Sequence, residues 1–132
     1  MTTANLTPHP LDPLSADEFT KITEIVRTQH GQEMKFTSVL LDEPGKQALA
    51  NAATEPIDRV ATVICLDRTT GRTYTGKVSL TDETVVEWEY REGEQANLVG
   101  EELELVDEKL REDPRVIEAI AKRGITDMDL VA

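Results

Sequence analysis

Apolar residues between positions 15 and 30 recur at spacings of three and four, as they do on one side of an α-helix. These apolar positions are Phe19, Ile22, Ile25 and Val26. Ser15 precedes them as a helix N-cap, Glu18 stands three positions later as its capping-box partner, and Gly31 follows as a stop signal. The pattern predicts one long amphipathic helix, whose apolar side must pack on another element.

Four short segments after Gly31 carry the apolar runs or the period of two that is typical of β-strands. They cover residues 34–41, 59–66, 73–80 and 86–90. A short helical or irregular connection joins the first two, and residues 67–72 form a hairpin turn in which Gly71 can take a positive φ. Alternation in the last two strands leaves one sheet face solvated, so we expect the helix to cover the other. The predicted fold is α+β, with one long helix packed on a four-stranded antiparallel meander sheet.

After Gly93 the apolar period changes from two to about 3.6, which predicts a short helical pair. The first helix is expected over residues 101–112, and Asp113 is the N-cap of a second helix that begins at Pro114. The pair has only a narrow apolar side, and a new apolar run begins at Leu130. We therefore expect these residues to open a further unit that is incomplete. The alternative is that the pair docks on the first domain as its C-terminal flank.

These patterns predict three parts of the chain. Residues 1–13 contain three prolines and are expected to form an extended N-terminal arm. Residues 14–97 are expected to form the helix-on-sheet domain, and residues 98–132 the incomplete helical start of the next domain.

Composition narrows the class of protein. The 132 residues include 26 acidic and 14 basic ones, for a net charge of −12, so we expect no nucleic-acid partner. No apolar stretch approaches the length of about 18 residues that a membrane helix needs, and no secretion signal is recognisable, so we expect no membrane partner and a cytoplasmic location. The one cysteine, Cys65, lies in an apolar run, where we expect a buried strand thiol.

Residues that could carry chemistry are sparse. His9 and His30 are 21 positions apart, so no closely spaced pair of imidazoles is available to begin a metal site. The acidic clusters at 101–104 and 127–129 lack the ligand ladder and turn glycine of a calcium loop. Neither a phosphate-binding glycine motif nor a nucleophile elbow occurs in the sequence. We expect no catalytic, cofactor-binding or metal-ligating residues in this chain.

Six short motifs remain. They are His9-Pro10-Leu11-Asp12-Pro13-Leu14-Ser15, Leu41-Asp42-Glu43-Pro44-Gly45-Lys46, Arg59-Val60-Ala61, the turn from Asp67 to Gly71, Asp113-Pro114, and the stretch from Arg123 to Val131. Together they resemble the N-terminal region of copper amine oxidases, the topaquinone-dependent enzymes that oxidise primary amines, and the resemblance spans nearly the whole chain. It implies a cystatin-like second N-terminal domain at residues 14–97 and the opening of the third at residues 98–132.

The resemblance also implies what a longer parent polypeptide would contain. In this family a C-terminal catalytic domain holds copper on three histidines, two of them in a His-x-His pair, and carries topaquinone formed from a tyrosine in an Asn-Tyr-Asp or Asn-Tyr-Glu sequence. Tyr74 and Tyr90 are flanked differently, so the resemblance transfers no site residue to them. The implied parent is a homodimer, similar to tyramine oxidase, that converts a primary amine, oxygen and water to an aldehyde, ammonia and hydrogen peroxide.

Two functional hypotheses follow from these observations. The first is that the chain is a non-catalytic N-terminal part of such an oxidase, so that copper and topaquinone belong to the parent and none is bound here. The alternative is a free-standing acidic cystatin-like module that binds a protein through its uncovered sheet face. Protease inhibition of the cystatin kind is disfavoured, because the Gln-x-Val-x-Gly wedge of those inhibitors is absent from the sequence.

Overall fold

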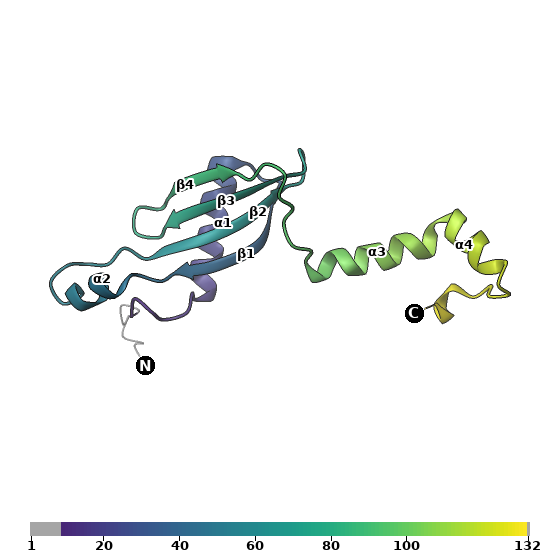
Figure 1. Ribbon diagram of the computed structural model, residues 1–132, viewed down its shortest axis with the longest axis horizontal. Coiled ribbons are helices and arrows are strands. Elements are labelled where there is room, and N and C mark those ends of the chain that lie inside the picture. The colour runs from purple at the N-terminus through teal and green to yellow at the C-terminus, as the bar shows by residue number, and fades with distance from the viewer. Residues whose placement is uncertain (1–8, 132) are drawn as a thin grey trace. The chain divides into compact units, whose positions relative to one another are not determined.

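The computed structural model describes residues 9–131, which form two compact units divided between Ala96 and Asn97. The first unit is an antiparallel sheet with one long helix on one of its faces (Figure 1). Its elements are α1 (Ala16–His30), β1 (Met34–Asp42), α2 (Lys46–Asn51), β2 (Val60–Asp67), β3 (Arg72–Ser79) and β4 (Thr84–Tyr90). The strands are hydrogen-bonded in the order β1-β2-β3-β4. The predicted α+β fold, a helix on a four-stranded meander followed by short helices, is confirmed.

The helix α1 begins where the sequence predicts. The Ser15 hydroxyl accepts a hydrogen bond from the Glu18 amide at 3.2 Å, and the Glu18 carboxylate accepts one from the Ser15 amide at 2.8 Å, which completes the capping box. Ile22 and Val26 are fully buried against the sheet. Phe19 was expected beside them but remains 40% exposed, because it lies in the first turn, ahead of the core.

The core lies between α1 and the sheet. It is formed by eight buried apolar residues, Ile22, Val26, Met34, Ala61, Val63, Cys65, Val78 and Leu80. In β2, which was expected as a continuous apolar run, every second residue of the central part is fully buried. The sequence gives this core no large aromatic residue, and Trp88 packs only at its margin.

The β3–β4 pairing contains an irregularity that the sequence pattern does not reveal. The register shifts between Lys77 and Val78, so that Val78 pairs with Val85 rather than Val86. A register shift of one residue moves side chains to the opposite face. Val85 therefore packs against the core, whereas Val86, which was expected inside, is 50% exposed.

The solvated sheet face also differs from expectation at the two ends of β3. Thr73 and Ser79 are buried although their alternation predicts exposure. Neighbouring loops contact both residues: the Thr73 hydroxyl accepts a hydrogen bond from the Ala96 amide after β4, and the Ser79 hydroxyl accepts one from the Asp82 amide in the turn after β3. Each buried hydroxyl is thus satisfied.

Gly76 in β3 has no side chain because the Trp88 ring occupies that space. A Cβ placed on Gly76 would lie 2.5 Å from Trp88 Cε3 and 3.0 Å from the Glu87 carbonyl oxygen. The ring therefore rests directly on the β3 backbone, which is possible only over glycine.

We expect Gly76→Ala to lower the free energy of unfolding by about 2 kcal/mol, because Trp88 must leave its position. Urea denaturation followed by Trp88 fluorescence measures this change. Gly45→Ala is the matched control, since nothing lies within 4 Å of a Cβ there, and its effect is expected within about 0.5 kcal/mol. Equal effects of the two substitutions would contradict the close packing at Gly76.

The N-terminal arm is only partly described. Residues 1–8 lie outside the described residues. Residues 9–13, which were expected to be extended, instead form a turn in which the Asp12 amide donates a hydrogen bond to the His9 carbonyl oxygen at 2.9 Å. The side chains explain the difference, because the Asp12 carboxylate also accepts a hydrogen bond from the His9 amide at 2.7 Å.

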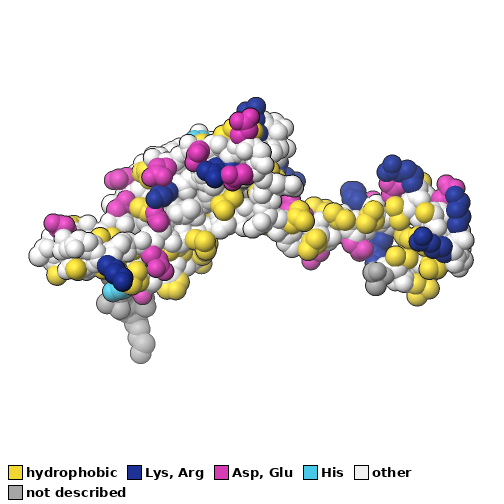
Figure 2. Space-filling view, in the orientation of Figure 1, with side chains coloured by type: hydrophobic (Ala, Val, Ile, Leu, Met, Phe, Trp, Pro, Cys, Tyr) yellow, Lys and Arg dark blue, Asp and Glu magenta, His cyan; other side chains and the backbone are white. Residues whose placement is uncertain are grey.

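The second unit contains α3 (Gly100–Glu112), α4 (Pro114–Ala121) and a short 3₁₀ helix η1 (Met128–Leu130). Asp113 caps α4, with Pro114 at its first position, as the sequence predicts. Arg111 holds the end of the unit by donating hydrogen bonds to the carbonyl oxygens of Met128 and Val131, both at 2.6 Å. None of the helical residues is buried, and apolar side chains line the exposed surface of this unit (Figure 2). Such a face is normally covered in a folded protein.

Candidate functional site

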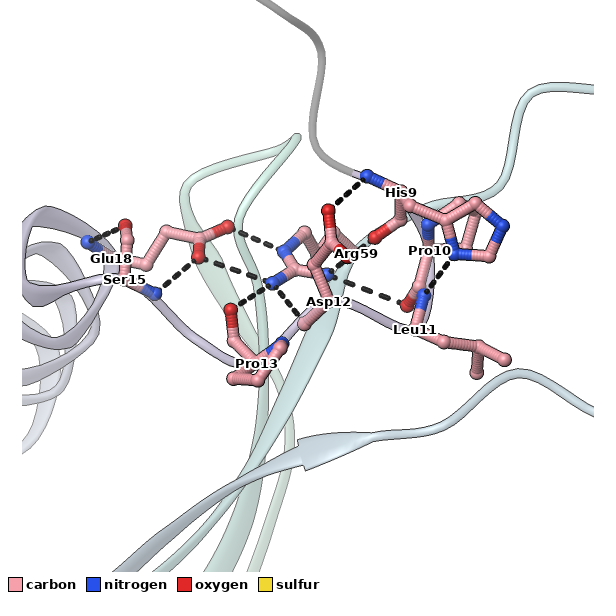
Figure 3. Close-up of polar contacts among 8 residues, drawn as sticks. All are labelled: His9, Pro10, Leu11, Asp12, Pro13, Ser15, Glu18 and Arg59. Atoms are coloured by element: carbon pink, nitrogen blue, oxygen red, sulfur yellow. Dashed lines mark hydrogen bonds and ion pairs between the residues drawn. The ribbon is translucent and has the colours of Figure 1, made fainter.

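The most connected polar group in the described residues is the guanidinium of Arg59, which precedes β2 (Figure 3). Its Nε and Nη2 donate hydrogen bonds to the two carboxylate oxygens of Glu18 in α1. Its Nη1 and Nη2 also donate to four backbone carbonyl oxygens in the N-terminal turn: those of His9 at 3.3 Å, Pro10 at 3.4 Å, Asp12 at 2.6 Å and Pro13 at 3.0 Å. We call Arg59, Glu18 and residues 9–13 the Arg59 clamp.

The contacts in the clamp favour the charged form of the Glu18 carboxyl group. The hydrogen bond from Arg59 is the main reason that the pKa of Glu18 is lowered, with the Ser15 amide contributing in the same direction. Only 12% of the Arg59 side chain and 18% of the Glu18 side chain are exposed. All the donors of the guanidinium are engaged, so Arg59 has none left for an external anion. Its role is therefore structural.

The clamp brings together two motifs that are far apart in the sequence. His9-Pro10-Leu11-Asp12-Pro13 supplies the carbonyl oxygens, and Arg59 is the first residue of the Arg-Val-Ala motif. Nothing in the sequence of either motif indicates that the two meet in the fold. A single basic residue directly before a buried strand was the only signal that Arg59 has an interior partner.

The residues considered for metal or redox chemistry lie apart. In the N-terminal turn, His9 Nδ1 accepts a hydrogen bond from the Leu11 amide, whereas His30 stacks on Trp88 at the other end of α1. Within residues 9–131, no three His, Cys, Asp or Glu side chains form a group that could hold a metal ion. Cys65 is fully buried, and desolvation raises the pKa of its thiol to about 12. The predicted buried strand thiol is confirmed.

One carboxylate of each acidic cluster accepts a hydrogen bond at the start of a helix. Glu102 accepts a hydrogen bond from the Val99 amide at the start of α3, and Asp127 accepts one from the Asp129 amide at the start of η1. Carboxylates at these positions satisfy free amides and suit the helix dipole. They are helix caps.

The aromatic side chains form a row on the α1 side of the sheet. The His30 and Trp88 rings stack with centroids 4.0 Å apart, and Tyr74 stacks on Trp88 at 5.4 Å. Tyr90 continues the row, with the Arg72 guanidinium 5.2 Å from its ring centroid, but it is 44% exposed. Trp88 thus contacts α1 through His30, whereas Tyr90, the last residue of β4, is partly exposed.

The stack makes stability depend on the protonation of His30. Burial lowers the pKa of His30 from its ordinary value of 6.5, so the unfolded chain binds this proton more readily than the folded chain. The contribution of neutral His30 is fully present above its ordinary pKa and is lost as the pH falls below that value. We expect the free energy of unfolding to decrease between about pH 7.5 and about pH 5.5, and His30→Gln to reduce that slope. An unchanged slope in His30→Gln would contradict this assignment.

The fold and the polar contacts together define a class of protein: a helix-on-sheet domain whose most connected polar group is a structural clamp. The family model of the AGAO-like N2 domain matches residues 15–88. The chain belongs to this family, and its resemblance to the N-terminal region of copper amine oxidases is confirmed. No helix in the described part of the chain is long and apolar enough to span a membrane.

Curated relatives agree with this assignment. A primary amine oxidase of Arthrobacter sp. (strain P1) is 36% identical over 126 residues, which cover 93% of this chain and 19% of the relative. Copper amine oxidase 1 of Schizosaccharomyces pombe is 31% identical over 123 residues, which cover 88% of this chain and 17% of the relative. A primary amine oxidase of Klebsiella aerogenes is 29% identical over 126 residues, with 91% and 16% covered. The chain thus spans less than a fifth of the length of these relatives.

Proposed function

We propose that these residues are a non-catalytic N-terminal part of a copper- and topaquinone-dependent primary-amine oxidase. The observation that carries the proposal is the match of 93% of this chain to 19% of a primary amine oxidase. The parent reaction would convert a primary amine, oxygen and water to an aldehyde, ammonia and hydrogen peroxide. Amines such as tyramine are candidate substrates, and the cytoplasm is the predicted location.

The histidines of this chain do not fit the copper centre of such an oxidase. Copper sites with imidazole ligands need side chains that converge on one point. His9 belongs to the N-terminal turn and His30 stacks on Trp88 at the far end of α1, so each is held by its own local contacts. Copper and topaquinone would therefore be held by the C-terminal catalytic domain of the parent, which we propose to be a homodimer.

The domain assignment belongs to the same proposal. Residues 14–97 are assigned to the cystatin-like second N-terminal domain and residues 98–132 to the start of the third. The exposed apolar side chains of α3 and α4 support this assignment, because a helix with such a face packs on a further element in a stable domain. The names of the curated relatives favour this proposal over a free-standing binding module.

Incubating the chain with cupric ion in air tests the non-catalytic part of the proposal. We expect neither the visible absorbance of a quinone nor hydrogen peroxide after a primary amine is added, because the chain has no convergent imidazole ligands. The appearance of either signal, absent from a sample treated with a chelator, would contradict the proposal.

A further inference from the structure

A pocket of about 190 Å³ lies at the end of the first unit where the N-terminal turn, the segment after β1 and the segment before β2 come together. Its apolar lining consists of Pro10, Leu41, Pro44 and Ile57. These residues come from the His9–Ser15 motif, the Leu41–Lys46 motif and the stretch before Arg59. Two of the sequence motifs and a stretch that adjoins a third thus form one concave surface.

The size of the pocket suits a single apolar side chain. Engineered cavities of about 150 Å³ with apolar walls bind a benzene-sized molecule. The present pocket is similar in volume, and four of its eight lining residues are apolar. Most binding pockets combine such apolar walls with a few polar groups that fix orientation.

The walls are held in place before any ligand binds. Pro10 belongs to the turn that Arg59 holds through the carbonyl oxygens of His9 and Pro10. Leu41 pairs with Ala61 in the sheet, and the Leu80 amide donates a hydrogen bond to the Arg59 carbonyl oxygen at 2.9 Å. Prolines and ladder hydrogen bonds limit the motion of the walls, which reduces the entropy lost on binding.

The charged residues that line the pocket indicate which kind of residue should stand next to the bound apolar side chain. Asp42, Asp58 and Arg59 line the pocket. Asp42 pairs with Lys77 at 3.0 Å, and Glu18 neutralises Arg59, but among residues 9–131 the Asp58 carboxylate has no ion-pair partner. An uncompensated carboxylate beside an apolar pocket favours a cationic group next to the apolar one.

We propose that this pocket binds a peptide segment in which an apolar side chain, such as leucine, is followed by a lysine or arginine. The apolar side chain fills the space between Pro10, Leu41 and Ile57, and the cation lies beside Asp58. This inference does not depend on the parent reaction, since it uses only the walls and charges of the first unit.

A titration of the isotope-labelled chain with acetyl-Gly-Leu-Lys-Gly-amide, followed by amide NMR shifts, tests the proposal. We expect saturable shifts centred on Leu41, Ile57 and Asp58, with a dissociation constant of about 1 mM. Acetyl-Gly-Gly-Lys-Gly-amide and acetyl-Gly-Leu-Glu-Gly-amide should each bind at least about fivefold more weakly. Equal binding of the three peptides, shifts centred elsewhere, or no saturable shift at millimolar peptide would overturn the proposal.

A charge reversal at the pocket provides a second test. Asp58→Lys should invert the preference, so that the Leu-Glu peptide binds more tightly than the Leu-Lys peptide. Glu55→Lys is the matched control, because Glu55 is exposed nearby but does not line the pocket and alters the net charge equally. Unchanged dispersion of the NMR spectrum shows that each variant is folded. An unchanged preference in Asp58→Lys, or an inverted one in Glu55→Lys, would contradict the role of Asp58.

Discussion

Replacing Arg59 with alanine is expected to lower the free energy of unfolding of the first unit by about 3 kcal/mol. The substitution removes both hydrogen bonds to Glu18 and leaves that carboxylate mostly buried without its cation. It also frees four backbone carbonyl oxygens of the N-terminal turn. Urea denaturation followed by the fluorescence of Trp88, the single tryptophan, measures the loss.

Two further variants separate the clamp from a general effect of charge. Arg59→Lys keeps the charge but cannot form the planar fork, so its stability should fall between those of the parent chain and Arg59→Ala. Arg91→Ala also removes an arginine with two carboxylate partners, Glu89 and Glu94, but that group lies at the surface. Its expected cost is below about 1 kcal/mol. Similar losses in Arg59→Ala and Arg91→Ala would contradict the structural role of the clamp.

Ile22→Ala is expected to cost about 3 kcal/mol, because Ile22 is fully buried where α1 packs on the sheet. The loss combines the transfer energy of the removed methyl and methylene groups with the cavity they leave. The same urea denaturation assay measures the effect.

Leu40→Ala serves as the control for Ile22→Ala. Leu40 is in β1 but is 63% exposed, so its removal should change the free energy of unfolding by less than about 0.5 kcal/mol. If the two substitutions had equal effects, the face of the sheet that α1 covers would be wrongly assigned.

Elements whose signals are local could be predicted from the sequence. The capping box at Ser15 and Glu18, the positive φ of Gly71 and the Asp113-Pro114 start of α4 all appear where the sequence placed them. Each depends on residues within a few positions of one another. The apolar run at residues 59–66 likewise predicted a strand in which Cys65 is buried.

Features that depend on residues distant in the sequence could not be predicted. Val85 rather than Val86 faces the core because β4 pairs irregularly with β3. The sequence of neither strand alone indicates this irregularity. The turn at residues 9–13 is stabilised by Arg59, about fifty positions away. Gly76 gave no sign that it accommodates Trp88, since a lone strand glycine is equally typical of a bulge.

For the functional residues, the sequence supports one expectation, which concerns an absence. Residue types and spacing indicated that His9, His30, Tyr74 and Tyr90 do not form a copper and quinone site, and this remains a prediction. The Arg59 clamp and the pocket beside it were not foreseen, although their motifs had been noted. A sequence motif identifies residues that belong to the fold's recurring features. The contacts of those residues depend on how distant segments pack.

Amine-dependent hydrogen peroxide formation by the intact parent polypeptide is the most direct test of the proposed function. The polypeptide that carries these residues would be loaded with copper in air and assayed with tyramine and with methylamine, beside the present chain treated identically. We predict that the intact polypeptide releases peroxide and aldehyde in equal amounts and that the present chain releases neither. An intact polypeptide without amine-dependent peroxide, or a present chain that produces it, would contradict the proposal.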